Sequence, residues 1–224
     1  MTVNNATVIQ KRLVLLGMLH VLDDLAGSRC CSSDTRAQLT WFVGFPVAKW
    51  FLKYVMPALE DEINNGMCAP TLITVWLGTN DVVLTGGSNA EMHVLIETYT
   101  ENLVNIVTSF QAAAPDVKIL LVPPPHVNDV ARAKYAKQQA DAKRSLVGRF
   151  NAMPGTYAHA CVKAGLKTGV PVLNLYEYFS AMPEATRNVL LRDGLHFITA
   201  DHKIVDKQFR SKIETEFPSV ITKF

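Results

Sequence analysis

The stretch Leu72-Ile73-Thr74-Val75-Trp76-Leu77-Gly78-Thr79-Asn80-Asp81 decides the fold class of this chain. Its first six residues form a short run of apolar and β-branched side chains, which is typical of a strand covered on both faces. Glycine, asparagine and aspartate follow, and these residue types favour a turn. Further runs of this kind are residues 13–16, which end at Gly17, residues 117–122, which end at Pro123, and the weaker run 170–175. The sequence therefore predicts several strands buried in one sheet.

Segments with helical spacing of apolar residues lie between and after these runs. They are residues 50–63, 92–113, 130–150, 157–166 and 200–217. Strands that alternate with helices of ten or more residues indicate βαβ units and a parallel sheet. We therefore predict a three-layer α/β/α fold with a parallel sheet of about five strands. Because the sequence has no linker, internal repeat or low-complexity tract, we expect residues 1–224 to form a single domain, in which residues 18–48 are atypical.

The composition excludes several classes of protein. The chain has 224 residues, of which 49% are hydrophobic and 19% are charged, so it has enough apolar surface to build a core. A net charge of +2 argues against a dedicated nucleic-acid-binding protein. No apolar run reaches the roughly 20 residues of a membrane-spanning helix, so we expect no membrane span. The four cysteines are scattered and form no C-x-x-C pair, which is typical of reduced thiols and predicts a cytoplasmic protein.

Two polar motifs are candidates for chemistry. Asn80 follows a predicted strand, and a side-chain amide at that position can donate to a developing oxyanion, although Gly78-Thr79-Asn80-Asp81 is also an ordinary turn sequence. In Asp193-Gly194-Leu195-His196, a carboxylate three residues before an imidazole can hold the ring in one tautomer. The alternative is a helix-entry aspartate beside a partly exposed histidine. We consider a metal site less plausible, because Asp193 and His196 have no third or fourth ligand at a useful spacing.

Taken together and in this order, the motifs resemble the GDSL (SGNH) hydrolase family, close to its isoamyl-acetate-hydrolysing esterase branch. Gly78-Thr79-Asn80-Asp81 is similar to the block that carries the oxyanion asparagine, and Arg192-Asp193-Gly194-Leu195-His196-Phe197 to the block with the catalytic aspartate and histidine. Val122-Pro123-Pro124-Pro125 and Tyr99-Thr100-Glu101-Asn102-Leu103 are also similar. The resemblance covers about residues 49–217, and residues 11–17 by pattern.

The resemblance implies a flavodoxin-like strand order and hydrolysis of small carboxylic esters. In that family His196 would take the proton of the nucleophile and Asp193 would orient His196. Asn80 and the backbone N–H of Gly44 would stabilise the oxyanion. The resemblance implies no metal or organic cofactor and a small-molecule ester as the substrate, and it leaves the oligomeric state unknown.

The sequence departs from the family at the nucleophile. The family has Gly-Asp-Ser at the end of its first strand, whereas this chain has Gly17-Met18-Leu19, so Leu19 occupies the place of the serine. Three interpretations of residues 18–48 stay open: true divergence to a pseudoenzyme, use of another serine (Ser28, Ser32 or Ser33), or a segment read in the wrong frame. The normal pattern on both sides favours the third. A non-catalytic relative that binds an acyl or ester-like ligand, or a protein partner, is the alternative function.

Several other residues have competing interpretations. His126, after three prolines, would either line the substrate pocket or be a loop histidine without a role. The basic residues of 132–149 are interpreted as a solvated face: Arg132, Lys134, Lys137, Lys143, Arg144 and Arg149. The three tryptophans are expected in the core or in a pocket wall: Trp41, Trp50 and Trp76.

Overall fold

The apolar runs of the sequence form the strands of one parallel sheet. The computed structural model describes residues 11–16, 40–41 and 47–220. Its strands are β1 (Lys11–Leu16), β2 (Thr40–Trp41), β3 (Ala69–Trp76) and β4 (Lys118–Val122). They lie in the order β2-β1-β3-β4, and every pair is parallel. This is the beginning of the 2-1-3-4-5 order of a flavodoxin-like sheet.

The expected fifth strand is not confirmed within the described residues. Residues 170–175 were predicted as a weak strand, but only Val172 forms a parallel bridge, to Leu121 of β4. The backbone N–H of Leu173 also donates to the carbonyl of Leu121 at 2.8 Å. Helix α7 begins at Leu175 and ends this short pairing.

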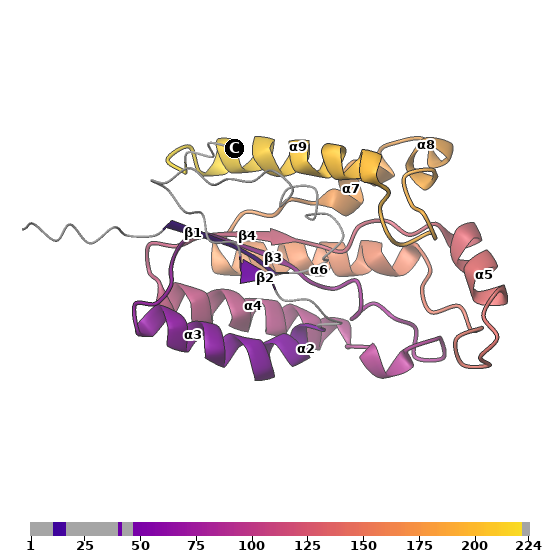
Figure 1. Ribbon diagram of the computed structural model, residues 1–224, viewed down its shortest axis with the longest axis horizontal. Coiled ribbons are helices and arrows are strands. Elements are labelled where there is room, and N and C mark those ends of the chain that lie inside the picture. The colour runs from indigo at the N-terminus through magenta and orange to yellow at the C-terminus, as the bar shows by residue number, and fades with distance from the viewer. Residues whose placement is uncertain (1–10, 17–39, 42–46, 221–224) are drawn as a thin grey trace, which may run out of the picture.

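Helices cover both faces of the sheet, as the alternating pattern predicts (Figure 1). One face carries α3 (Met56–Asn64), α4 (Ile96–Ala113) and α6 (Ala152–Thr168), and the other carries α7 (Leu175–Ser180) and α9 (Thr199–Glu216). The remaining described helical elements are α2 (Ala48–Trp50), the π-helix η2 (Phe51–Val55), the 3-10 helix η3 (Ala90–Met92), α5 (Asp129–Lys137) and α8 (Glu184–Asn188).

Alternation along the strands creates two cores. Ile73 and Val75 of β3 pack with buried residues of α4 and α6, such as Phe110, which is 0% exposed. Leu72 and Trp76 point to the opposite face and pack with α7 and α9, where the rings of Trp76 and Phe209 lie 5.7 Å apart. Successive side chains of a strand point to opposite faces, so one apolar run serves both layers.

The predicted helices are present, but their bounds differ: α4 begins at Ile96 rather than at residue 92, and α6 begins at Ala152 rather than at residue 157. Residues 50–63 are helical, but the π-helix η2 precedes α3. Pro57, in the first turn of α3, lacks the backbone N–H that a continuous regular helix would need. The predicted helix 130–150 is wrong beyond Lys137, where α5 ends. Trp50 is also not a core residue, because its side chain is 46% exposed, whereas Trp76 is buried as expected.

Across the part of the chain that the structure describes, no helix is both long enough and apolar enough to cross a membrane.

Candidate active site

The carboxyl ends of β1, β3 and β4 lie at the same edge of the sheet. Leu16, the last residue of β1, pairs with Val75, and Trp76, the last residue of β3, pairs with Val122, the last residue of β4. Because all of these strands are parallel, their carboxyl ends lie side by side. This is the edge at which parallel α/β sheets bind ligands.

Gly78 shapes the loop after β3. Its φ of +118° is in a region that other residues rarely adopt, and an added Cβ would lie 2.7 Å from the Tyr99 hydroxyl and 2.9 Å from Cδ of Pro124. The Tyr99 hydroxyl in turn donates to the carbonyl of Leu77 at 3.0 Å. Glycine is therefore required here, and it directs the chain sharply into Asn80.

Asp193 and His196 form a hydrogen-bonded pair. Oδ2 of Asp193 lies 2.9 Å from Nδ1 of His196, and Oδ1 accepts from the backbone N–H groups of Leu195 and His196 at 3.1 and 2.9 Å. A carboxylate can only accept, so Nδ1 carries the proton and the lone pair is on Nε2. The His196 carbonyl accepts from the N–H of Arg192 at 2.8 Å, which closes the loop.

The hydrogen bonds of Asp193 outweigh its partial burial. Burial by itself raises the pKa of the Asp193 carboxyl, but the hydrogen bonds from the side chain and backbone of His196 lower it well below its usual range. Asp193 is therefore ionised at neutral pH. An ionised carboxylate beside Nδ1 both orients the imidazole and stabilises its positive charge once Nε2 takes up a proton.

The start of helix α5 packs against the loop that contains Asp193. Gly194 has a φ of +83°, and a Cβ there would lie 2.8 Å from the carbonyl oxygen of Asn128 and 3.0 Å from the backbone nitrogen of Arg132. The Gly194 carbonyl accepts from the N–H of Asn128 at 3.0 Å. Nη1 of Arg132 lies 3.4 Å from both the carbonyl oxygen and Oδ2 of Asp193. The turn and the first residues of α5 thus form one packed unit.

Arg149 is bonded to the loop that carries Asn80, and sequence reasoning missed this contact. Its Nη2 donates to Oδ1 of Asn80 at 2.8 Å, and its Nε donates to the carbonyl of Thr79 at 2.7 Å. Burial, followed by the charge of Arg132, lowers the pKa of Arg149 to about 10, and the charge of Asp193 acts in the opposite direction. Its guanidinium therefore lies within electrostatic range of Asp193 while it is bonded to Asn80.

The interpretation of residues 132–149 as a solvated basic face is wrong for two of its members. Arg132 and Arg149 are 7% and 3% exposed: Arg132 contacts the partly buried Asp193 carboxylate, and Arg149 donates to the Thr79 carbonyl and to the Asn80 amide oxygen. The other four basic residues do lie at exposed or partly exposed positions. No pattern in the sequence separates these two arginines from their neighbours.

Asp81, next to Asn80, is fully buried. Its Oδ1 accepts from the backbone N–H of Ala48, at the start of α2, at 2.9 Å. Burial raises the pKa of the Asp81 carboxyl to about 7, against the opposing effect of its backbone hydrogen bonds. The last residue of the Gly78 motif therefore has a structural partner in α2 and lies inside the protein.

His126 does not line a pocket, because its side chain is 0% exposed. Its ring lies 5.0 Å from that of Phe179 and 6.4 Å from that of Phe197, and Nε2 lies 3.0 Å from the carbonyl of Arg187. Since the carbonyl accepts, Nε2 carries the proton. Burial lowers the pKa of His126 to about 4, so it is neutral at physiological pH.

Two of the expected site residues, Leu19 and Gly44, lie outside the described residues, as do most of residues 18–48. Their expected roles stay predictions. The described part of β1 ends at Leu16, which pairs with Val75 of β3.

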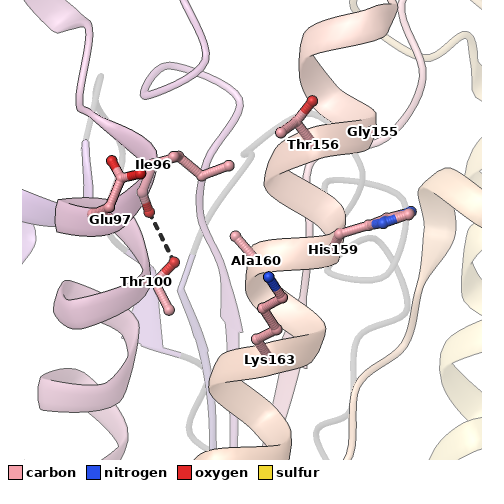
Figure 2. A pocket seen from close by; sticks show the side chains of 8 residues that line it. All are labelled: Ile96, Glu97, Thr100, Gly155, Thr156, His159, Ala160 and Lys163. Carbon is pink, nitrogen blue, oxygen red and sulfur yellow. Dashed lines mark hydrogen bonds between the residues drawn. The ribbon is translucent and has the colours of Figure 1, made fainter.

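A surface pocket of about 440 Å³ lies elsewhere, between α4 and α6. Figure 2 shows Glu97 and Thr100 on α4 opposite Ala160 and Lys163 on α6. None of Asn80, Asp193 and His196 lines it. Within the described ranges no group of three or more histidine, cysteine, aspartate or glutamate side chains could hold a metal ion.

The fold and the paired motifs define a class of α/β proteins with a polar site at the carboxyl edge of a parallel sheet. The chain belongs to the GDSL-like lipase/acylhydrolase family, whose model matches residues 56–204. The matched part includes Asn80, Asp193 and His196, and it begins after Leu19 and Gly44.

Similar sequences agree with this assignment, and a solved structure is similar in fold. A GDSL esterase/lipase of Arabidopsis thaliana is 28% identical over 75% of this chain and 68% of its own length. The isoamyl acetate-hydrolyzing esterase 1 homolog of Bos taurus is 26% identical over 75% of this chain and 65% of its own. The chain thus spans about two thirds of these relatives. The crystal structure of the lipase/acylhydrolase from Enterococcus faecalis superposes with a TM-score of 0.63 at 18% identity, covering 92% of this chain and 96% of that one, which establishes the likeness of fold.

Proposed function

We propose that the carboxyl edge of the sheet is the site of an ester hydrolase for small carboxylic esters. In this proposal His196 is the general base, Asp193 orients it, and Asn80 donates to the oxyanion. The observation that carries the proposal is the 2.9 Å hydrogen bond between Oδ2 of Asp193 and Nδ1 of His196. It leaves the lone pair of the imidazole on Nε2, where a base for a hydroxyl nucleophile needs it.

Under this proposal, the chain with leucine at position 19 has almost no esterase activity. Leu19 occupies the nucleophile's place in the sequence, and a branched alkane can neither attack a carbonyl carbon nor give a proton to His196. Without a nucleophile, such a site keeps only the modest effect of oxyanion and substrate binding.

The test is to supply the missing hydroxyl. In the double variant Met18→Asp with Leu19→Ser, the new hydroxyl oxygen would attack the ester carbonyl while Nε2 of His196 takes its proton. The leaving alkoxide would then receive that proton, and water would release the acid in a second step. We expect p-nitrophenyl acetate hydrolysis near background for the unaltered chain and a clear gain for the double variant.

A third protein gives the control. The double variant with His196→Ala should lose the gain, because its hydroxyl has no base. A gain that survives without His196, or no gain in a folded double variant, contradicts the assignment. We expect only partial recovery, because the segment from Gly44-Phe45 to Lys49-Trp50-Phe51-Leu52 is shorter than the family block that carries the backbone donor. One oxyanion donor contributes roughly 3–4 kcal/mol.

The alternative function is a binding protein for an acyl or ester-like ligand, and the leucine at position 19 favours it. The two functions differ in turnover. A folded double variant that binds a short-chain carboxylate such as butyrate but hydrolyses no ester would support the binding protein.

A further inference from the structure

A buried cation, Arg149, holds the Asn80 side chain. Arg149 is 3% exposed, and it donates from Nε to the Thr79 carbonyl at 2.7 Å and from Nη2 to Oδ1 of Asn80 at 2.8 Å. The two acceptors belong to consecutive residues of the loop after β3. A planar guanidinium with two donors engaged in this way fixes both the loop and the side chain that projects from it.

This contact selects one of the two orientations of the Asn80 amide. A terminal amide can exchange its oxygen and nitrogen by a half-turn about its last torsion. With Oδ1 toward Arg149, an acceptor faces a donor, and Nδ2 is turned away from the guanidinium. The reverse orientation would place the Nδ2 hydrogens against the N–H groups of a buried arginine and leave donors without acceptors.

The charges around Arg149 suit an anionic oxygen. Arg132 and Arg149 are both buried; Nη1 of Arg132 lies 3.4 Å from Oδ2 of Asp193, and the charge of Asp193 also raises the pKa of Arg149. The pKa of Arg149, about 10, still leaves it protonated at neutral pH. Arg149 therefore places a positive charge directly beside Asn80.

We propose that Arg149 is a positioning residue, which holds Asn80 in the amide orientation that lets Nδ2 donate to a carbonyl or carboxylate oxygen of the ligand. The proposal rests on the function proposed for the sheet edge, and it assigns a role to a residue outside both sequence motifs. Arg149 acts through Asn80 and has no contact with the ligand of its own.

The test is a double-mutant cycle on ligand binding by the chain as it stands. Butyrate is titrated into the unaltered chain, Arg149→Gln, Asn80→Ala and the combination of both. We expect Arg149→Gln to weaken binding about tenfold, and to have no further effect where Asn80 is already alanine, because the arginine then has no amide to orient. Equal losses in both backgrounds would overturn the proposal and give Arg149 a direct or merely structural role.

A matched control is available in the same segment. Arg144 is exposed, and Arg144→Gln removes the same charge five residues away without touching the Asn80 loop. We expect butyrate affinity within twofold of the unaltered chain. A tenfold loss in this variant as well would show a general charge effect and overturn the proposal.

A spectroscopic readout separates failure of this proposal from failure of the proposed function. The side-chain NH2 signals of Asn80, assigned by their loss in Asn80→Ala, report the amide without any ligand. We expect Arg149→Gln to shift and broaden them, while Arg144→Gln leaves them in place. If they stay unchanged in Arg149→Gln, the proposal is wrong, whether or not butyrate binds.

Arg149→Lys covers the case in which the glutamine variant does not fold. Lysine keeps the positive charge but replaces the planar pair of donors with a single ammonium group. We expect shifted Asn80 NH2 signals and a loss of butyrate affinity smaller than tenfold. Unchanged signals together with unchanged affinity would show that the two-point contact is dispensable and would overturn the proposal.

Discussion

The Asp81 carboxylate accepts a hydrogen bond from the Ala48 backbone N–H at 2.9 Å and so ties the loop after β3 to the first turn of α2. Asp81 is 0% exposed, and among the described residues its Oδ2 has no hydrogen-bond partner. Position 81 therefore keeps α2 beside Asn80, with a carboxyl group whose ionisation is unfavourable where it lies.

We expect this buried carboxyl to reduce stability as pH rises. Its pKa is about 7 in the folded protein, against an ordinary value of 3.8, so the folded state holds the proton more tightly. The resulting stabilisation is complete below about pH 4 and is lost as pH rises through 7. Asp81→Asn keeps an acceptor for Ala48 and should remove this dependence.

The measurement is urea unfolding of both proteins at pH 5 and pH 8. The unaltered chain should lose on the order of 2 kcal/mol more stability than Asp81→Asn over this interval. Parallel pH profiles for the two proteins would show that Asp81 does not titrate in this range.

His126 should have the opposite pH dependence. Its pKa is about 4 in the folded protein, below the ordinary 6.5, so the unfolded chain takes up the proton first. The stability that neutral His126 allows is present above pH 6.5 and is lost as pH falls toward 4. Relative to His126→Phe, the unaltered chain should lose on the order of 1–2 kcal/mol between pH 7 and pH 5.

Thermal or urea unfolding of these two proteins at several pH values tests this. Since only the difference between them is compared, titration of the other groups cancels. A constant difference from pH 7 to pH 5 would contradict the assignment of a buried neutral imidazole at position 126.

Gly194→Ala should destabilise the fold and the site together. The new Cβ would lie 2.8 Å from the carbonyl oxygen of Asn128, 2.9 Å from Cβ of Ala131 and 3.0 Å from a backbone nitrogen, at a φ of +83°. Backbone atoms cannot yield as a flexible side chain can, so we expect a loss of about 1–3 kcal/mol in unfolding free energy. Gly86→Ala is the matched control, because no atom lies within 4 Å of its added Cβ, and it should change stability by less than about 1 kcal/mol.

Asp193→Asn should leave the protein folded but alter His196. An amide can present its nitrogen to Nδ1 and favour the wrong tautomer, so in the double variant with the restored hydroxyl we expect ester hydrolysis to fall by about 10³–10⁴-fold. The stability of the unaltered chain should also fall more below pH 4 than that of Asp193→Asn. The pKa of Asp193 is depressed, so its contribution is present above pH 3.8 and is lost as pH falls.

Two assays check this prediction. The first is p-nitrophenyl acetate hydrolysis by the double variant with and without Asp193→Asn. The second is acid unfolding of the unaltered chain and of Asp193→Asn, monitored by circular dichroism. Asp206→Asn serves as the comparison, since Asp206 forms its ion pair with Arg210 of its own helix. Equal activity with asparagine at position 193 would exclude Asp193 as the orienting group.

The sequence by itself determined the parallel α/β architecture and the two motifs. Residues 72–77 predict a strand from the local sequence, because a short run of apolar and β-branched residues that ends in a turn signal at Gly78 is typical of a strand buried on both faces. Asp193 and His196 are three residues apart, so their hydrogen bond forms within one turn of the chain and the spacing already indicates it.

Only the tertiary structure decided what happens between distant segments. Arg149 is one of several basic residues in its stretch, and its burial depends on Asn80, which lies 69 residues away. Helix α5 ends at Lys137 rather than near residue 150, and the chain beyond it reaches the Asn80 loop. His126 likewise became a core residue through rings at positions 179 and 197. Local spacing cannot encode such contacts, because a polar side chain is buried only where a partner from elsewhere in the chain satisfies it.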